Sequence, residues 1–134
     1  MPGSRARRTL GRIWLCVLAV LPPATALTQP AGERLLNSAH TLLGRGLHEQ
    51  AADESRSALP DLDDPRQMAE ARYGLAIALN SLGEIDDAIN ALDAIDASAD
   101  FAQRTDANAL LASLLASRGD YARASRACER VKDD

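Results

Sequence analysis

The sequence predicts an all-α protein of about three consecutive helix–turn–helix units, and three observations lead to this prediction. Small residues recur along the chain at a nearly constant interval. The apolar residues between them follow a helical period, and no stretch alternates polar with apolar residues as a half-buried strand does. Only 3% of the 134 residues are aromatic. A core of Ala, Leu and Ile suits closely packed helices better than a β-sandwich.

The repeat is clearest in three glycines. Gly46, Gly83 and Gly119 are separated by 37 and then 36 residues. The same two intervals separate three further sets of positions, namely Ala39, Ala76 and Ala112; Ala51, Ala88 and Ala124; and Ala58, Ile95 and Val131. Several positions that keep one register indicate a true repeat. A glycine at the end of each first helix is expected to adopt the left-handed conformation that closes the helix.

The first unit, residues 32–60, is expected to follow a short lead at residues 27–31. Its apolar stripes are weak, and consist of Leu35, Ala39 and Leu42, then Ala51, Ala52, Ser55, Ala58 and Leu59. Pro60 is expected to end its second helix. The second unit, residues 65–97, is expected to begin with Asp64 as N-cap and Pro65 at the first helical position.

The apolar stripes of the later units are stronger. Those of the second unit are Leu75, Ala76, Leu79 and Leu82, then Ile85, Ala88, Ile89, Leu92 and Ile95. The third unit, residues 100–132, is expected to have Asp100 as N-cap. Its stripes are Leu111, Ala112 and Leu115, then Tyr121, Ala124, Cys128 and Val131.

Residues 1–26 have the three parts of a secretory signal peptide. Residues 1–12 contain four arginines and no acid, residues 13–21 are uninterruptedly apolar, and residues 24–26 (ATA) provide small residues around a cleavage point. The apolar run is shorter than the roughly 20 residues that span a bilayer. We expect export to the periplasm or secretion after cleavage at Ala26, with retention as an N-terminal anchor as the alternative.

The charge of the chain excludes two classes of partner. The net charge is -4, so the basic surface that nucleic-acid binding requires is missing. Removing the four arginines of residues 1–26 takes the charge from -4 to -8, which predicts no attraction to anionic membranes. Cys128 would then be the only cysteine, expected as a small apolar filler, with an intermolecular disulfide as the alternative.

The sequence lacks the combinations of side chains that catalysis requires. The only histidines are His40 and His48, and Ala52 stands where a zinc-protease helix starting at His48 needs its second histidine. The sequence has no nucleophile elbow, phosphate-binding glycine loop or paired-cysteine motif. The acidic loop at residues 61–64 lacks the later glycine and glutamate of an EF-hand, so a solvated turn is expected. We therefore expect no enzyme, no cofactor and no metal.

The turn sequences resemble those of the tetratricopeptide repeat family. Residues 82–89 (LGEIDDAI) are similar to the family's Gly-Asp-Tyr-x-x-Ala turn, and residues 118–124 (RGDYARA) are closer still. Residues 46–51 keep only the Gly and the Ala. The resemblance covers residues 32–132. The spacing exceeds the family's 34 residues, and the large aromatic early in each first helix is replaced by Leu35, Arg72 and Asn108. An unrelated array of helical hairpins is the alternative.

The resemblance implies a right-handed solenoid whose first helices line a concave groove that binds a peptide or helix of another protein. The implied groove residues are Leu36, Asn37 and His40, then Tyr73, Ile77 and Asn80, and finally Ala109, Ser113 and Ser117. None is basic, which argues against a clamp for an acidic C-terminus and for a neutral or apolar ligand. Tyr73 is the expected anchor. The alternative is that these residues only cover the inside of the solenoid.

The third unit predicts a second surface. Stable arrays carry a polar capping helix after the last unit, whereas Ala127, Cys128 and Val131 fall close to the last residue, Asp134. These three residues are expected to form an interface with another subunit or a second copy. The alternative is that the array is only marginally stable. Two functions follow: an exported protein-binding adaptor or scaffold, or a structural subunit of a larger envelope assembly or homodimer.

Overall fold

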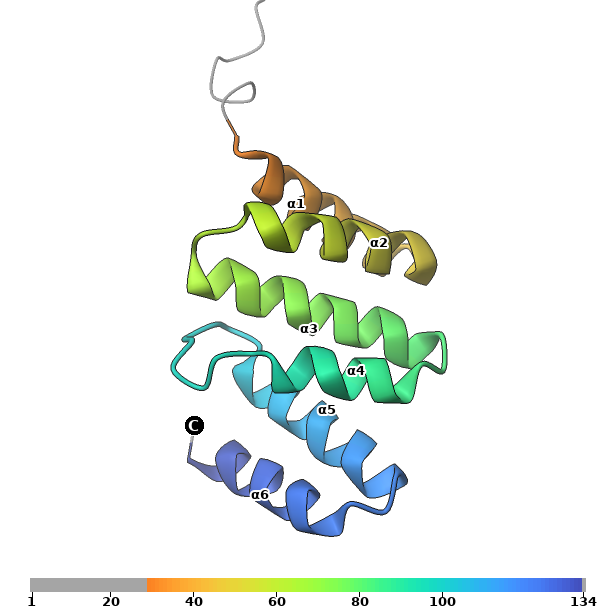
Figure 1. Cartoon of the computed structure of the whole chain (residues 1–134), viewed down its shortest axis with the longest axis vertical. Helices are drawn as coiled ribbons and strands as arrows, with labels where there is room; N and C mark the ends of the chain where they lie inside the picture. The colour runs from red at the N-terminus through yellow and green to blue at the C-terminus, as the bar shows by residue number, and fades with distance from the viewer. Residues whose placement is uncertain (1–28, 134) are drawn as a thin grey trace, which may run out of the picture.

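The computed structural model describes residues 29–133, so the predicted signal peptide lies outside the described residues. The described residues form six α-helices and no strand, which confirms the all-α prediction (Figure 1). The helices are α1 (Ala31–Gly44), α2 (His48–Ala58), α3 (Pro65–Ser81), α4 (Ile85–Asp93), α5 (Arg104–Ser117) and α6 (Tyr121–Lys132). None of them combines the length and the apolar character needed to cross a bilayer.

The six helices pair into three hairpins that follow one another along the long axis of the molecule (Figure 1). The first hairpin is α1–α2, the second α3–α4 and the third α5–α6. Each helix packs chiefly against its neighbours in sequence, and α1 also packs against α3. The first and third hairpins therefore lie at opposite ends of the array.

The three hairpin turns have one and the same hydrogen-bond geometry. Gly46, Gly83 and Gly119 have φ of 73°, 81° and 80°. Each glycine N–H donates to the carbonyl three residues before it, at 3.0, 3.1 and 3.0 Å. The next N–H donates to the carbonyl five residues before it, at 3.0, 2.9 and 2.9 Å. This is the Schellman ending of a helix, and it confirms the predicted left-handed glycines.

The helix starts were predicted correctly at one of two positions. The Asp64 carboxylate accepts a hydrogen bond from the Arg66 N–H at 2.9 Å, with Pro65 as the first helical residue. The Asp100 prediction is wrong, because α5 begins at Arg104 and Gln103 occupies the cap position. Phe101 is only 5% exposed, so the chain stays outside helical geometry there to place this ring in the core.

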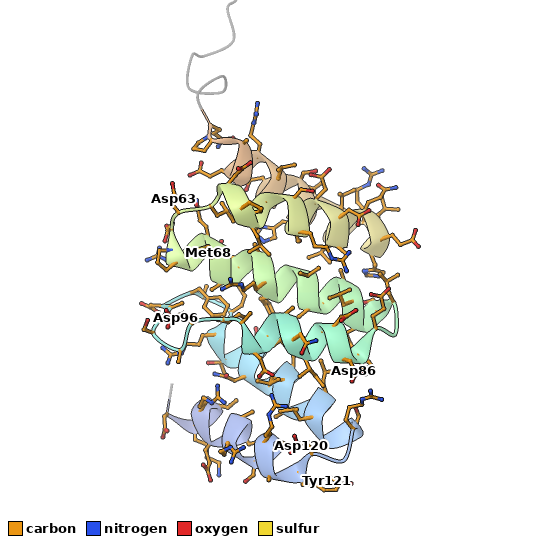
Figure 2. The ribbon with its side chains drawn as sticks, in the orientation of Figure 1. Asp63, Met68, Asp86, Asp96, Asp120 and Tyr121 are labelled. Atoms are coloured by element: carbon orange, nitrogen blue, oxygen red, sulfur yellow. The ribbon has the colours of Figure 1, made fainter. Side chains whose placement is uncertain are left out.

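Alanines form the seam of each hairpin. Ala39 and Ala51 are buried in the first hairpin, and Ala76 and Ala88 occupy the same repeat positions in the second. Their methyl groups let the two helices approach closely. In contrast, the prediction for Tyr121 is wrong, because this residue of the apolar stripe is 73% exposed at the outer edge of the third hairpin (Figure 2).

The residues between α4 and α5, residues 94–103, form a packed loop. Asp96 accepts hydrogen bonds from the backbone N–H and the hydroxyl of Ser98, both at 2.8 Å, and these bonds lower the pKa of Asp96. The Arg72 guanidinium donates to the Ala94 carbonyl at 2.6 Å. The loop is thereby tied to α3, and it delivers Phe101 to the space between the second and third hairpins.

Candidate protein-interaction surfaces

Two hollows are lined by residues that the sequence predicts to bind a partner. The first, here called the α1–α3 pocket, has a volume of about 170 Å³. It is lined by His40 and Leu43 of α1, by Glu70, Tyr73, Gly74 and Ile77 of α3, and by Gln103 of the loop. Residues from two hairpins and one loop, which lie far apart in sequence, therefore meet at one place.

Gly74 opens the floor of this pocket. A methyl group at this position would lie 3.3 Å from the Leu43 Cδ1 atom and 4.0 Å from the His40 Cδ2 atom. It would also lie 3.9 Å from the Ser55 hydroxyl of α2. The glycine thus lets the α3 backbone approach the first hairpin and leaves room above it, which any larger side chain would fill.

Tyr73 is held in position by the loop. Its ring packs against the Phe101 ring with centroids 6.5 Å apart and planes tilted by 56°, which is within the distance range of favourable aromatic pairs. Burial raises the pKa of Tyr73 above its usual value of 10.0, and the nearby Asp106 carboxylate raises it further. The phenol is therefore neutral at physiological pH and available as a hydrogen-bond donor.

The chemistry of the α1–α3 pocket is mixed. Leu43 and Ile77 supply apolar surface, whereas His40, Glu70 and Gln103 supply polar atoms. Such a combination fits a side chain with an apolar body and a hydrogen-bonding tip better than an ion. No lysine or arginine lines this pocket.

The second hollow, here called the α5–α6 groove, is larger and more apolar. Its volume is about 670 Å³. It is lined by Ala109, Ala112, Ser113 and Ala116 of α5, and by Tyr121, Ala124, Ser125, Cys128, Val131 and Lys132 of α6. Most of these side chains are small, so the groove exposes the seam of the third hairpin along its length. Lys132 is the only charged residue in the lining.

The structure divides the predicted site residues between these two hollows. His40, Tyr73 and Ile77 meet in the α1–α3 pocket, and Ala109, Ser113, Cys128 and Val131 meet in the α5–α6 groove. Asn37, Asn80 and Ser117 are exposed and line neither hollow.

Two predicted surface residues are buried, and for them the prediction is wrong. Leu36 is 4% exposed, because it packs with Ala58, Leu62 and Ala71 in a small core cluster. Ala127 is 0% exposed and belongs to the main core. Only Cys128 and Val131 of the predicted C-terminal interface reach the surface.

Sequence reasoning missed four residues of the α1–α3 pocket, namely Leu43, Glu70, Gly74 and Gln103. Leu43 lies three residues after His40, Glu70 three before Tyr73 and Gly74 three before Ile77, so helical spacing from the predicted residues was a usable signal for all three. Gln103 gave no such signal, because it comes from a loop whose path depends on where Phe101 packs.

Few groups in the described part of the chain suit metal or nucleophilic chemistry. Residues 29–133 contain no cluster of three or more His, Cys, Asp or Glu side chains that could hold a metal ion. Cys128 is a free, exposed thiol. The Ser55 hydroxyl and the His48 Nδ1 atom are buried and find no hydrogen-bond partner among the described residues.

Comparison of the chain with protein-family models, with curated proteins and with solved structures gives no match.

Proposed function

We propose that this chain is an exported, non-enzymatic adaptor that binds another protein through the α1–α3 pocket. One observation carries the proposal: His40, Tyr73 and Ile77, from the first helices of two successive hairpins, converge on one pocket together with Glu70 and Gln103. An aromatic ring fixed beside apolar and polar groups is the usual composition of a binding hot spot.

The proposal treats residues 32–132 as a right-handed, tetratricopeptide-like solenoid. It is supported by the Schellman turn that recurs at all three glycines and by the constant register of the seam alanines. Export is supported by the basic, apolar and small-residue parts of residues 1–26.

The pocket favours a neutral ligand over a charged terminus. A carboxylate would meet Glu70 and find no lysine or arginine in the lining. A segment of a partner protein that inserts one amphipathic side chain between His40 and Tyr73 fits this composition. Its recognition would come from the shape made by Gly74 and from the Tyr73 phenol.

A second candidate function is that of a structural subunit in a larger envelope assembly or homodimer. It is favoured by the α5–α6 groove, in which Cys128 is exposed and Val131 half-buried. Here the third hairpin would be docked permanently, and the α1–α3 pocket would have no binding role.

Photo-crosslinking followed by affinity measurement tests the adaptor proposal. A photoreactive amino acid replaces the exposed His40 of the full chain in the cells that express it, and the captured protein is identified. The same probe at exposed Asn90 of α4 is the control. The purified partner should then bind the wild-type chain, and Ile77→Arg should weaken that binding about tenfold or more, whereas Asn90→Arg should leave it unchanged.

Two results would contradict the adaptor function. One is capture of the same protein with equal efficiency from His40 and Asn90. The other is an affinity for the purified partner that Ile77→Arg does not alter.

A further inference from the structure

The repeat register shows that the α5–α6 groove corresponds to surfaces that are covered elsewhere in the molecule. One interval of 36 residues relates Ser125 and Cys128, which are exposed, to Ile89 and Leu92, which are buried. The preceding interval of 37 relates those residues to Ala52 and Ser55, which are also buried. In both earlier hairpins the first helix of the next hairpin packs on this surface.

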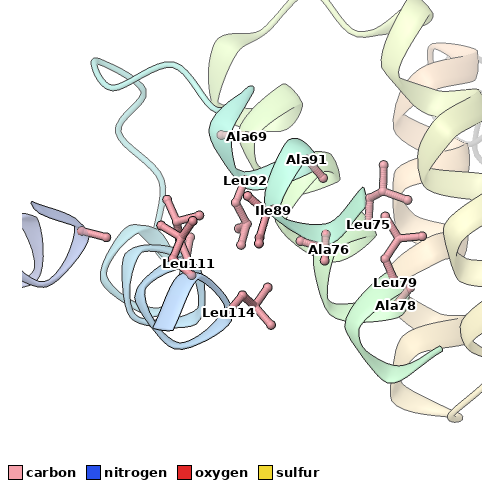
Figure 3. Packing of buried hydrophobic residues seen from close by; sticks show 14 of the residues in the cluster. Ala69, Leu75, Ala76, Ala78, Leu79, Ile89, Ala91, Leu92, Leu111 and Leu114 are labelled. Atoms are coloured by element: carbon pink, nitrogen blue, oxygen red, sulfur yellow. The ribbon is translucent and has the colours of Figure 1, made fainter. Parts of the chain in front are cut away.

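The helices that cover these surfaces carry a ridge of apolar residues. On α3 the ridge is Ala71, Gly74, Leu75 and Ala78, and on α5 the residues one interval later are Ala107, Leu110, Leu111 and Leu114, of which Leu110 alone is half-buried and the others are buried. Contact of the α3 ridge with the first hairpin is direct, because a methyl group at Gly74 would lie 3.9 Å from the Ser55 hydroxyl. Leu111 and Leu114 of α5 face the second hairpin (Figure 3).

The size of the side chains on each hairpin matches the ridge that it receives. The first hairpin presents Ala52 and Ser55 to the small ridge of α3. At the same positions the second hairpin presents Ile89 and Leu92 to the larger ridge of α5. The third hairpin has Ser125 and Cys128 there, so it resembles the first hairpin and not the second. A small ridge of the α3 kind is therefore its steric complement.

We propose that the α5–α6 groove binds an amphipathic helix of a partner protein with a small-residue ridge like that of α3. The ridge has Ala or Gly at its first, fourth and eighth positions and Leu at the fifth. This binding surface is separate from the α1–α3 pocket and goes beyond the proposed function.

Charge and direction define the partner helix further. Successive helices of the array are antiparallel, so a helix that follows the repeat begins near the last turn of α6. Lys132, the only charged residue of the groove lining, lies in that turn. An Asp or Glu in the first turn of the partner helix would face this ammonium group and also favour its own helix N-terminus.

A second copy of this chain does not offer the required ridge. At the other end of the array, α1 has Arg34, Asn37, Ser38 and Thr41 at the positions that correspond to the α3 ridge. These residues are polar and mostly exposed. Pairing of two α5–α6 grooves would not supply the ridge either, because no leucine that could take the place of Leu75 lines the groove.

The α3 sequence itself supplies a probe for the groove. A dye-labelled peptide of residues 63–82 contains the small ridge and two acidic residues before its first turn. We expect the full chain to bind this peptide in a fluorescence anisotropy titration, and to bind the α5 peptide, residues 103–118, more weakly. Changing Leu75→Lys in the first peptide should abolish binding.

Matched variants of the protein locate the binding. Ser125→Arg fills the groove from an exposed position and should weaken peptide binding about tenfold or more, whereas Ser57→Arg, at an exposed position of α2, should not. Lys132→Glu should weaken it by a smaller factor. Ile77→Arg, which alters the α1–α3 pocket, should leave it unchanged, so the two proposals fail independently. Should Ser125→Arg unfold by circular dichroism, Ser113→Arg replaces it.

Three outcomes would overturn the inference. The first is no detectable binding of the residue 63–82 peptide at concentrations up to about 1 mM. The second is equal binding to wild type and Ser125→Arg, which would mean that the peptide displaces α3. The third is a doubled mass in sedimentation that Ser125→Arg abolishes, which would show a second copy in the groove.

Discussion

The two junctions between hairpins use the same repeat positions and nevertheless differ in packing. At the first junction α3 packs against both α1 and α2, and the Gln67 amide donates to the Glu33 carboxylate at 3.1 Å. At the second junction α5 packs against α4 and makes little contact with α3. There Phe101 fills the space between the helices.

The difference originates in a few side chains at equivalent positions. Gly74 of α3 corresponds to Leu110 of α5, and Ser55 of α2 corresponds to Leu92 of α4. Glycine and serine let the first two hairpins approach closely, whereas two leucines hold the later pair further apart. Two exposed ion pairs, Arg118–Asp86 and Arg123–Asp93, add links across the second junction. A constant repeat register in the sequence therefore does not determine how closely successive hairpins pack.

Removing the ring that fills the second junction should have the largest effect. Phe101→Ala should lower the free energy of unfolding by about 3–5 kcal/mol, because it deletes a buried aromatic side chain and leaves a cavity. Urea denaturation followed by circular dichroism measures this. Ala102→Ser, at the exposed neighbouring position, is the control and should be near neutral. A loss below 1 kcal/mol would mean that the loop does not support the junction.

The second-largest loss of stability is expected when the leucine of the second junction replaces the glycine at the corresponding position of the first. Gly74→Leu adds a side chain where a methyl group already lies 3.3 Å from the Leu43 Cδ1 atom. We expect a loss of about 1–3 kcal/mol in the free energy of unfolding from overpacking. Leu110→Ile at the corresponding position of α5 conserves volume and should cost less. Equal losses for the two variants would contradict the difference in spacing.

At the buried serine of the first junction we expect a smaller change, and here the free energy of unfolding should rise. Ser55 is 0% exposed, and its hydroxyl has no hydrogen-bond partner among the described residues. Ser55→Ala removes an unsatisfied polar group and should raise the free energy of unfolding by about 1 kcal/mol. Ser57→Ala, on the exposed side of α2, should change it by less than about 0.5 kcal/mol. Destabilisation by Ser55→Ala would show that the hydroxyl has a partner in solution.

The smallest effect is expected in the pKa of Tyr73, which reports how well the second junction covers this ring. Because burial raises its pKa above 10.0, the neutral phenol favours the folded state, and this stabilisation is complete below pH 10.0 and is lost as the pH rises through the raised pKa. In a Tyr121→Phe background, ultraviolet absorbance should follow Tyr73 alone. Adding Phe101→Ala should lower the measured pKa, because the ring becomes more exposed. An unchanged pKa would mean that Phe101 does not cover Tyr73.

Local signals in the sequence were sufficient for the hairpins but not for their surfaces. The three glycines and the Asp64–Pro65 start depend on backbone conformation over a few residues, and the structure has both as predicted. The prediction of Asp100 as a cap was wrong because Phe101 is buried in the core, which is a tertiary effect, and α5 begins only at Arg104. In the same way, Leu36 is covered by Leu62, which lies in a segment that the sequence showed only as a loop.

The error at Ala127 has a geometric cause. Ala127 and Cys128 were assigned to one surface because both fall close to the last residue. Neighbouring residues of a helix point about 100° apart, so one of them faces α5 and the other the groove. Helical spacing from Cys128, and not sequence adjacency, indicates Ala124, Ser125 and Val131 as its neighbours in the groove lining.

The alanine seam also determines where this molecule can bend. A methyl side chain has no alternative rotamers, so Ala39, Ala76 and Ala112 lose no side-chain entropy on folding and cannot rearrange to absorb strain. Each hairpin should then move as a rigid body. Leucine side chains, in contrast, have alternative rotamers that can take up small displacements, so we expect thermal bending of the array to concentrate at the second junction and to change the angle between the α1–α3 pocket and the α5–α6 groove.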